Sequence, residues 1–264
     1  MAGCAPRDVP PVRVPRLVVA LAVRTALVTA PLVAQSVRTD STALLGGRIA
    51  VHGYLPAATP RCPPILLLSG DGGWELGVVD WAERLQREGH EVVGIDAARL
   101  VRLAGRGGLA ALVGAWPALR RLTAEPSVLL GYSRGATLGL VFATRAEPPP
   151  DAVLLGTDLE DGFGGPAAPR GLAPGAFRHG AYVVDLRPLY RDSGRATRIA
   201  IIHGARDQVA PYAAMRAWFD GLPEPKRITV LPRSGHGFAD ERALLPALHG
   251  ALNWAAERTC AHGR

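Results

Sequence analysis

A serine between two glycines is the residue of this chain with the clearest chemical potential. Residues 131–135 read Gly-Tyr-Ser-Arg-Gly, after an apolar run at 127–130 and before a helical pattern at 135–145. In that setting the motif is typical of a sharp strand-to-helix turn that lifts the serine hydroxyl clear of the sheet. The glycines remove side chains that would collide in such a turn. The spacing therefore predicts Ser133 as a nucleophile.

A nucleophilic serine needs a general base, and the base needs a carboxylate to orient it. Two loops downstream supply both, because Asp207 follows the apolar run 197–202 and His236 follows the run 227–231. The order serine, acid, histidine is the chain order of one large class of serine hydrolases. Ser133, Asp207 and His236 are therefore the predicted catalytic triad.

Three other residues compete for the roles of base and acid. His203 stands at a strand end, where we expect it to pack or hydrogen-bond near the loop rather than to act as the base. Asp158 and Asp161 follow the strand expected at 152–155, a position from which some hydrolases take their acid. Asp207 is favoured as the acid over Asp158 and Asp161.

A glycine-rich loop provides the third part of the predicted site. Residues 69–74, Ser-Gly-Asp-Gly-Gly-Trp, follow a short apolar run. In this kind of sheet that loop supplies one backbone N–H of the oxyanion hole, and the residue after the nucleophile supplies another. We therefore assign the hole to the N–H groups of Arg134 and of Asp71 or Gly72. Trp74 either covers the site or caps the core.

Strands and helices alternate along the chain around these residues. Short continuous apolar runs mark buried strands, and apolar residues at helical spacing mark the segments between them. The alternation predicts an α/β protein with a mostly parallel central sheet, helices on both faces and a short irregular cap or insert at 156–194. Together with the serine turn it predicts the α/β-hydrolase fold. The expected strands are 48–52, 65–68, 91–95, 127–130, 152–155, 197–202 and 227–231, and the expected helices are 78–88, 108–121, 135–145, 212–219 and 241–258.

Composition bounds the size of the domain and its partners. A length of 264 residues with 48% hydrophobic content suits one sizeable domain with a single core. The formal net charge of +7 comes mostly from arginines scattered along the chain. We therefore expect no nucleic-acid partner, and attraction to an anionic membrane surface fits the diffuse charge better. The sequence has no metal-ligand spacing, phosphate loop or dinucleotide fingerprint, so we expect no metal and no cofactor.

The start of the chain differs in character from the rest. Arginines precede two apolar stretches, 17–23 and 25–34, and small and polar residues follow. This order is typical of an export signal, whereas Arg24 argues against a membrane-spanning helix. We expect residues 1–34 to be an export signal or a disordered leader, and residues 35–264 to be a hydrolase domain. The expected location is the periplasm or another extracytoplasmic space, with the cytoplasm as the alternative.

Two cysteines remain beyond this leader. Cys62 precedes the strand expected at 65–68, and Cys260 ends the last expected helix. In a parallel sheet covered by helices these positions lie at the same edge, so a disulfide between them is geometrically reasonable. Such a bond would fit an exported protein. Two unpaired surface thiols are the alternative.

Four segments together resemble a known family. They are Leu-Ser-Gly-Asp-Gly-Gly-Trp at 68–74, Val-Val-Gly-Ile-Asp at 92–96, Gly-Tyr-Ser-Arg-Gly-Ala at 131–136 and Gly-His-Gly-Phe at 235–238. Over roughly residues 62–250 the chain resembles the family of the bacterial virulence protein VirJ and its relative AcvB. The resemblance implies an exported α/β-hydrolase that cleaves aminoacyl esters of phosphatidylglycerol. It also implies Ser133, Asp207 and His236 as catalytic serine, acid and histidine.

The sequence departs from that family in two places. Arg134 stands where the family usually has an aromatic residue, and the acid loop at 204–211 looks more like that of a general esterase or thioesterase. Two features bear on a lipid substrate: the acidic residues Asp158 and Asp161 could pair with a substrate amine, and Arg134 could face a phosphate. A solvated acidic turn and a surface arginine are the alternatives. Trp74, Asp158 and Asp161 are the candidate substrate-binding residues.

Three hypotheses for function follow from these observations. The first is an exported serine hydrolase that cleaves a carboxylic ester through an acyl-enzyme, with an aminoacylated phospholipid at the membrane surface as its substrate. The second is a general hydrolase of small esters or thioesters. The third is a catalytically idle, hydrolase-like binding partner of a secretion system. The presence of serine, acid and histidine together argues against the third, because a binding module has no need of all three.

Overall fold

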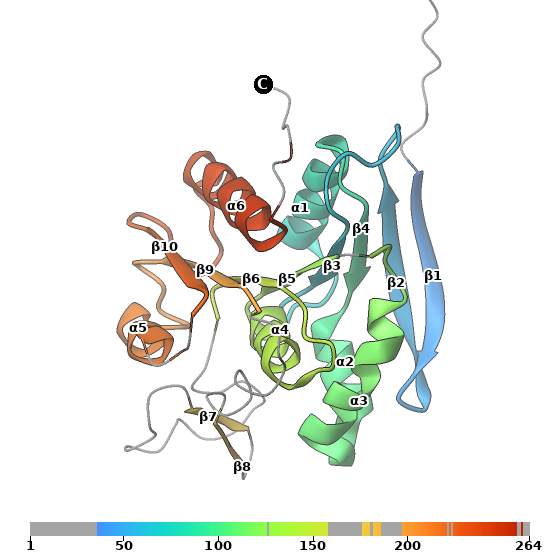
Figure 1. Cartoon of the computed structure of the whole chain (residues 1–264), viewed down its shortest axis with the longest axis horizontal. Helices are drawn as coiled ribbons and strands as arrows, with labels where there is room; N and C mark the ends of the chain where they lie inside the picture. The colour runs from blue at the N-terminus through green and yellow to red at the C-terminus, as the bar shows by residue number, and fades with distance from the viewer. Residues whose placement is uncertain are drawn as a thin grey trace, which may run out of the picture. The chain divides into compact units, whose positions relative to one another are not determined.

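The computed structural model describes residues 36–125, 127–157, 176–179, 182–185, 197–220, 222, 224–257 and 260. Within them, eight strands form one sheet in the order β1-β2-β4-β3-β5-β6-β9-β10 (Figure 1). The strands of this sheet are β1 (Ser36–Leu44), β2 (Gly47–Leu55), β3 (Ile65–Leu68), β4 (Val92–Ile95), β5 (Val128–Tyr132), β6 (Ala152–Leu155), β9 (Ile199–Gly204) and β10 (Lys226–Leu231). The helices are α1 (Leu76–Arg87), α2 (Ala97–Ala104), α3 (Gly108–Arg120), α4 (Arg134–Arg145), α5 (Tyr212–Asp220) and α6 (Glu241–Ala255), with a 3₁₀ turn at Gly105–Gly107.

The central sheet is mostly parallel, as the alternation of strands and helices predicts. Each neighbouring pair from β4 through β3, β5, β6 and β9 to β10 is parallel. The hairpin of β1 and β2 adds to β4 in the antiparallel sense. Because the parallel strands all end at one edge, the loops that follow β3, β5, β9 and β10 lie on the same side of the sheet.

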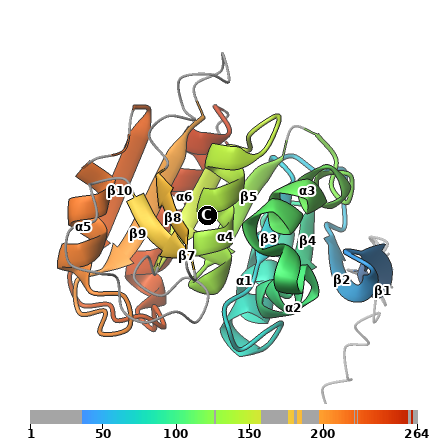
Figure 2. The ribbon, with the colours of Figure 1, turned by 90° about the horizontal axis from the view of Figure 1, so that it is seen from below.

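Helices cover both faces of the sheet, and alternate residues of each strand point to opposite faces. In β3, Leu66 and Leu68 pack in a cluster with α2, α3, α4 and α5, whereas Ile65 and Leu67 pack in a second cluster with α1 and α6. Figure 2 shows α2, α3, α4 and α5 together on the face toward the viewer. All four residues are at most 1% exposed. This explains the continuous apolar runs of the sequence, because each strand is covered on both sides.

Three elements of the fold differ from the sequence prediction. The first expected strand was 48–52, but the structure has a full hairpin of β1 and β2 joined by Leu45 and Gly46, both with positive φ (54° and 76°). Helix α2 was not predicted, although the side chain of Asp96 caps it by accepting the N–H of Arg99 at 2.8 Å. The segment expected to be irregular, 156–194, contains the paired strands β7 (Ala176–His179) and β8 (Tyr182–Asp185).

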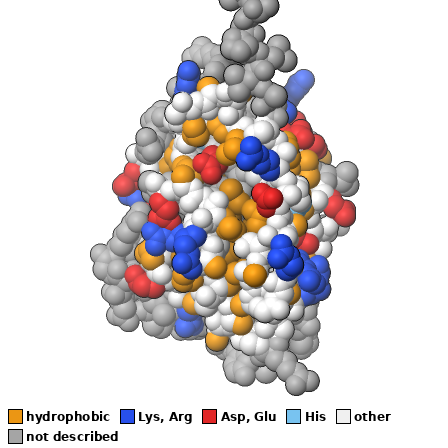
Figure 3. Space-filling view, turned by 90° about the vertical axis from the view of Figure 1, so that its right-hand side faces the viewer, with side chains coloured by type: hydrophobic (Ala, Val, Ile, Leu, Met, Phe, Trp, Pro, Cys, Tyr) orange, Lys and Arg blue, Asp and Glu red, His pale blue; other side chains and the backbone are white. Residues whose placement is uncertain are grey.

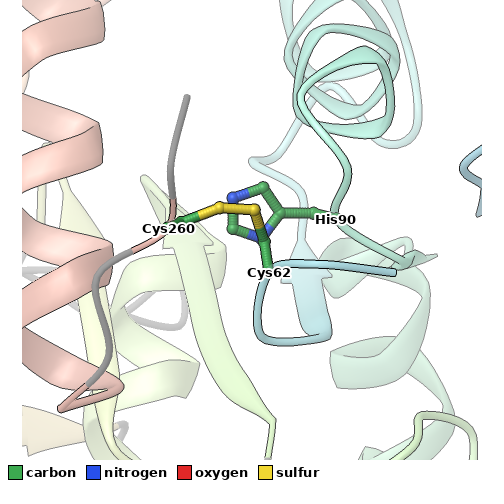
Figure 4. A group of neighbouring side chains, drawn as sticks. All are labelled: Cys62, His90 and Cys260. Carbon is green, nitrogen blue, oxygen red and sulfur yellow. A yellow bond between two sulfur atoms is a disulfide. The ribbon is translucent and has the colours of Figure 1, made fainter. Parts of the chain in front are cut away.

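A disulfide joins Cys62 to Cys260, with the Cα atoms 5.1 Å apart. It ties the loop that enters β3 to the segment after α6, so the first of the two sequence alternatives is the one found. His90 lies beside the bond (Figure 4), and its Nδ1 is 2.8 Å from the carbonyl oxygen of Pro63. The sulfur atoms and an imidazole nitrogen lie within 4.8 Å of one another, a grouping of donor types that sequence spacing did not reveal. In the structure the two sulfurs bind each other.

A second link to the C-terminal part of the chain runs through Glu88, which directly follows α1. Its carboxylate accepts hydrogen bonds from His249 Nε2 of α6 at 2.6 Å and from Arg84 Nε at 2.7 Å. Burial of the carboxyl by itself raises its pKa, but the bonds from His249 and Arg84 outweigh burial and lower the pKa to about 2. The ionised form of Glu88 is therefore part of the folded structure.

The surface that carries β1 and β2 has charges of both signs. Figure 3 shows Lys and Arg side chains interspersed with Asp and Glu around apolar side chains on that side, without a continuous positive band. None of the helices in the described part of the chain has the length and hydropathy of a membrane span.

Candidate active site

Ser133 stands in the turn between β5 and α4, with φ 52° and ψ −116°. A residue with a side chain adopts this conformation only when the surrounding structure holds it there. The hold comes from both sides of the turn: the N–H of Ser133 donates to Leu155 O at 2.8 Å, and its carbonyl accepts from the N–H of Ala136 at 2.9 Å. The strained backbone presents the hydroxyl at the carboxyl edge of the sheet, as the motif predicts.

The two glycines of the motif are required by close packing. A Cβ on Gly135 would lie 2.5 Å from the carbonyl oxygen of Ser69, and a Cβ on Gly131 would lie 2.7 Å from the Cα of Ala136. Both distances are too short for any side chain. The glycines therefore let α4 start directly against the loop after β3, which brings that loop to the side of the serine.

His236 and Asp207 complete a hydrogen-bonded chain with the serine. His236 Nε2 is 2.9 Å from Ser133 Oγ, and His236 Nδ1 is 2.8 Å from Asp207 Oδ2. An ionised carboxylate only accepts, so Nδ1 carries the proton and Nε2 offers its lone pair to the serine hydroxyl. The structure thus brings together the three residues predicted as the triad, each from a loop that follows a parallel strand.

Asp207 is held in place by its own loop. Its Oδ1 accepts the N–H groups of Val209 at 2.9 Å and Ala210 at 2.8 Å, and its side chain is inaccessible to solvent. His203, the competing histidine, is buried and its Nε2 donates to Ala210 O at 2.8 Å. Burial lowers the pKa of His203, only partly offset by that bond and by the charge of Asp207. His203 therefore supports the acid loop as a neutral side chain, as expected from its position.

The glycine-rich loop after β3 forms a tight turn next to the serine. The N–H of Gly73 donates to Gly70 O at 3.2 Å, which leaves Asp71 and Gly72 exposed at the tip. A Cβ on Gly70 would lie 3.4 Å from the Cβ of Ser133, so the loop runs directly alongside the nucleophile. Asp71 and Gly72 line the same pocket as Ser133.

Arg134, the other predicted oxyanion residue, is the first residue of α4. Its guanidinium binds the carboxylate of Asp71 through two bonds, Nε to Oδ1 at 2.7 Å and Nη2 to Oδ2 at 2.9 Å. The arginine that the sequence offered as a phosphate ligand is therefore engaged by a carboxylate of the same site. Sequence reasoning named both residues but not their pairing.

A pocket of about 510 Å³ opens over Ser133 and His236. Its apolar wall is formed by Val78 and Trp81 of α1, by Tyr132 and by Val209, a residue that is 59% exposed. These residues were missed as site residues, because Val78 and Trp81 look like the buried face of a helix in the sequence. The rings of Trp81 and Tyr132 meet in a T-shaped arrangement with centroids 5.2 Å apart, so this side of the pocket is aromatic.

The three candidate substrate-binding residues fare differently. Trp74 stacks on His52 with ring centroids 4.9 Å apart, and its Nε1 donates to the hydroxyl of Tyr54 at 3.2 Å. It packs over β2 and β4 and is not among the residues that line the pocket, so it caps the core. Asp158 and Asp161 lie outside the described residues.

Comparison with known proteins agrees with this architecture. Residues 64–149 match the family model described as bacterial virulence protein (VirJ). Over these residues the chain is VirJ-like. The VirJ-like segment covers about a third of the chain and includes the glycine-rich loop and Ser133, but ends before Asp207 and His236. No curated protein matches the sequence.

Solved structures match over most of the chain. The esterase domain of a Rhodothermus marinus protein has a TM-score of 0.58 at 19% identity, with 83% of this chain and 98% of that chain covered. A dienelactone hydrolase from Anabaena variabilis has a TM-score of 0.58 at 18% identity, with 85% and 99% covered. A cold-adapted esterase from an Arctic intertidal metagenomic library has a TM-score of 0.58 at 17% identity, with 84% and 93% covered. The predicted α/β-hydrolase fold is confirmed.

Proposed function

We propose that this protein is a serine hydrolase that cleaves carboxylic esters through an acyl-enzyme. The observation that carries the proposal is the unbroken hydrogen-bonded chain from Asp207 through His236 to Ser133 at the floor of a pocket. A strained serine, a correctly oriented imidazole and a buried carboxylate are the parts that acyl transfer needs.

The geometry supports the following sequence of steps. His236 Nε2 takes the hydroxyl proton of Ser133 as Oγ attacks the ester carbonyl, and Asp207 stabilises the imidazolium that forms. Negative charge develops on the carbonyl oxygen, and we assign its stabilisation to the N–H groups of Arg134 and of Asp71 or Gly72. His236 then returns the proton to the leaving alcohol. Water repeats the sequence on the acyl-enzyme and releases the acid.

A fluorophosphonate probe together with p-nitrophenyl esters tests this proposal. Wild-type protein is expected to bind the probe covalently and to hydrolyse the esters, whereas Ser133→Ala is expected to do neither. A matched serine in β1, Ser41→Ala, is expected to behave as wild type. A folded wild-type protein that neither reacts with the probe nor cleaves any ester or thioester would favour the idle binding partner instead.

An aminoacylated phospholipid is the second, finer proposal for the substrate. It is supported by the VirJ-like segment and by one carboxylate of the pocket. Glu75 lines the pocket that contains Ser133, and although it is the N-cap residue of α1, its side chain makes no capping hydrogen bond. Asp71, a second carboxylate among the described residues that line the pocket, is paired with Arg134. Glu75 is thus placed to pair with the ammonium group of an aminoacyl ester.

Mixed lipid vesicles test this second proposal. Vesicles with lysyl- or alanyl-phosphatidylglycerol are incubated with wild-type protein, and loss of the aminoacyl lipid is followed by thin-layer chromatography. Glu75→Gln is expected to raise KM for the cationic aminoacyl lipid several-fold while leaving KM for p-nitrophenyl butyrate unchanged. Equal effects on both substrates, or cleavage of the neutral ester alone by wild type, would leave the general esterase as the function.

We also propose that the protein is exported. The arginine-led apolar start of the chain and the Cys62–Cys260 disulfide support an oxidising compartment outside the cytoplasm. Cell fractionation is expected to recover the protein from the extracytoplasmic fraction, with removal of residues 1–34 expected to retain it in the cytoplasm. Equal distribution of both forms would refute export.

A further inference from the structure

We propose that the ion pair between Asp71 and Arg134 is a clamp that fixes the separation of the two backbone N–H donors of the oxyanion hole. This inference rests on the proposed hydrolase function. In it, Asp71 and Arg134 are positioning residues whose side chains act through their own backbone amides.

The first argument is the geometry of the pair. The bonds of 2.7 Å from Nε and 2.9 Å from Nη2 engage both carboxylate oxygens, which fixes direction as well as distance. The side chain of Arg134 is 17% exposed and that of Asp71 is 62% exposed. The arginine is therefore the less exposed partner that anchors the pair, and the aspartate is the outer residue that it holds.

The second argument is the mobility that the backbone would otherwise have. Three of the four residues at 70–73 are glycines, and glycine is the residue with the greatest backbone freedom. The turn has one backbone hydrogen bond of its own, from Gly73 to Gly70. Arg134, by contrast, begins a helix whose start is locked by close packing of Gly135 on Ser69. The ion pair thus attaches the flexible half of the oxyanion hole to the rigid half.

The third argument is the cost of misplacement. An oxyanion donor acts only at hydrogen-bond distance from the developing charge, and loss of one such donor lowers turnover about 100- to 1,000-fold. Asp71 and Arg134 are 63 residues apart in the chain, so no local turn fixes their spacing. Loosening the loop displaces a donor without removing it, so the expected loss is about 10- to 100-fold.

Steady-state kinetics on p-nitrophenyl butyrate provide the test. Asp71→Asn and Arg134→Gln each break the pair, and the exchanged double variant Asp71→Arg with Arg134→Asp restores it in reverse. As a control, Arg216→Gln breaks an Arg–Asp pair within α5, between Arg216 and Asp220, neither of which lines the pocket. We expect kcat to fall about 10- to 100-fold in both single variants with KM changed less than about 3-fold, and Arg216→Gln to match wild type.

Two readouts separate positioning from a general structural role. A boronic acid forms a tetrahedral adduct on serine, so its affinity is expected to fall by the same factor as kcat/KM, whereas the affinity of the product acid is expected to stay unchanged. The melting temperature is expected to fall by no more than about 4 °C, because partly exposed ion pairs contribute little to stability. The kcat of the exchanged double variant is expected to be at least about 3-fold higher than the kcat of the less active single variant.

The outcomes decide both proposals separately. Wild-type kcat in Asp71→Asn and Arg134→Gln would overturn the clamp and leave the hydrolase function standing. A loss of kcat that comes with a much larger fall in melting temperature, or with equal loss of product affinity, would likewise overturn it. A wild-type protein that hydrolyses no ester and leaves the fluorophosphonate unreacted would overturn the proposed function, and with it the clamp.

Discussion

Replacing Asp207 by asparagine is the change whose effect the structure specifies most closely. Two backbone N–H groups, from Val209 and Ala210, donate to Oδ1. The side-chain amide introduced by Asp207→Asn would therefore place its oxygen at that position, because the reversed amide would bring NH₂ against two donors. Losing two buried hydrogen bonds costs about 2–6 kcal/mol, which fixes the orientation. The amide NH₂ then faces His236 Nδ1.

That orientation reverses the tautomer of His236. With a donor opposite Nδ1, the ring proton moves to Nε2, the nitrogen that lies 2.9 Å from Ser133 Oγ. The imidazole can then no longer accept the hydroxyl proton. The wrong tautomer lowers turnover on the order of 10⁴-fold in serine triads, equivalent to about 5.4 kcal/mol of transition-state stabilisation. We expect that loss in kcat at pH 7 with little change in KM.

The assay is hydrolysis of p-nitrophenyl butyrate, with the rate of fluorophosphonate reaction as a second measure. Asp80→Asn makes the same chemical change on an exposed residue of α1 and is expected to match wild type. Asp158→Asn and Asp161→Asn test the competing acids and are expected to retain most of their activity. If Asp207→Asn kept more than about a tenth of wild-type kcat while Asp158→Asn lost it, the assignment of the acid would be wrong.

Three further predictions concern stability. Glu88→Gln removes a carboxyl whose pKa is lowered from 4.5 to about 2 in the folded protein. The contribution of this carboxylate to the free energy of unfolding, about 1–3 kcal/mol, is therefore complete above pH 4.5 and is lost as the pH falls toward 2. Urea unfolding of wild type and Glu88→Gln at pH 7 and pH 3 should show the difference in their stability shrinking, and a constant difference would contradict this. The double variant Cys62→Ala with Cys260→Ala opens a cross-link over 198 residues and is expected to lower the free energy of unfolding by about 2–5 kcal/mol, with reduced wild type as its control. Gly135→Ala is expected to prevent soluble expression because its Cβ meets backbone carbonyls. As a control, Gly114→Ala at an exposed position in the middle of α3 should raise the free energy of unfolding in urea by about 0.5–1 kcal/mol. A stable, active Gly135→Ala would show that the turn can relax.

The triad and the parallel sheet could be predicted because their signals are local. Buried strands such as β3 and β6 are continuous apolar runs, and a parallel sheet places the loops after them at one edge. Ser133 follows β5 directly, and Asp207 and His236 stand in the loops after β9 and β10. Their spatial meeting therefore follows from topology, without knowledge of any long-range contact.

Strand β1 and helix α2 escaped prediction for different reasons. Strand β1 is largely exposed and polar, so it has no apolar run, and its turn uses Leu45 where a two-residue hairpin normally has Asn or Asp. Helix α2 did have a usable signal, because Asp96 is a favoured N-cap residue directly after a strand. Residues 91–95 were predicted as a strand, and no helix was predicted directly after Asp96.

The pocket and the ion pair depend on contacts that a single sequence does not contain. Val78 and Trp81 occupy the apolar face of an amphipathic helix, and periodicity does not distinguish a face that meets the core from one that also borders a cavity. Arg134 and Asp71 were each assigned by their backbone N–H groups, and the partner expected for the side chain of Arg134 was a phosphate rather than Asp71. The positions came from the motifs, and the pairing came from the fold.

The disulfide also determines what happens when the backbone is cut. In the sequence, Ser133 precedes residues 158–196, and Asp207 and His236 follow them. The disulfide joins Cys62, which also precedes this stretch, to Cys260, which follows it. A protease that nicks any bond between the serine and the acid therefore produces two fragments that stay covalently attached. The cleaved protein would migrate as one band without reductant and as two with it. After such a cut, the fragment with Ser133 remains linked to the fragment with Asp207 and His236. Limited digestion therefore tests whether an intact backbone is needed for turnover.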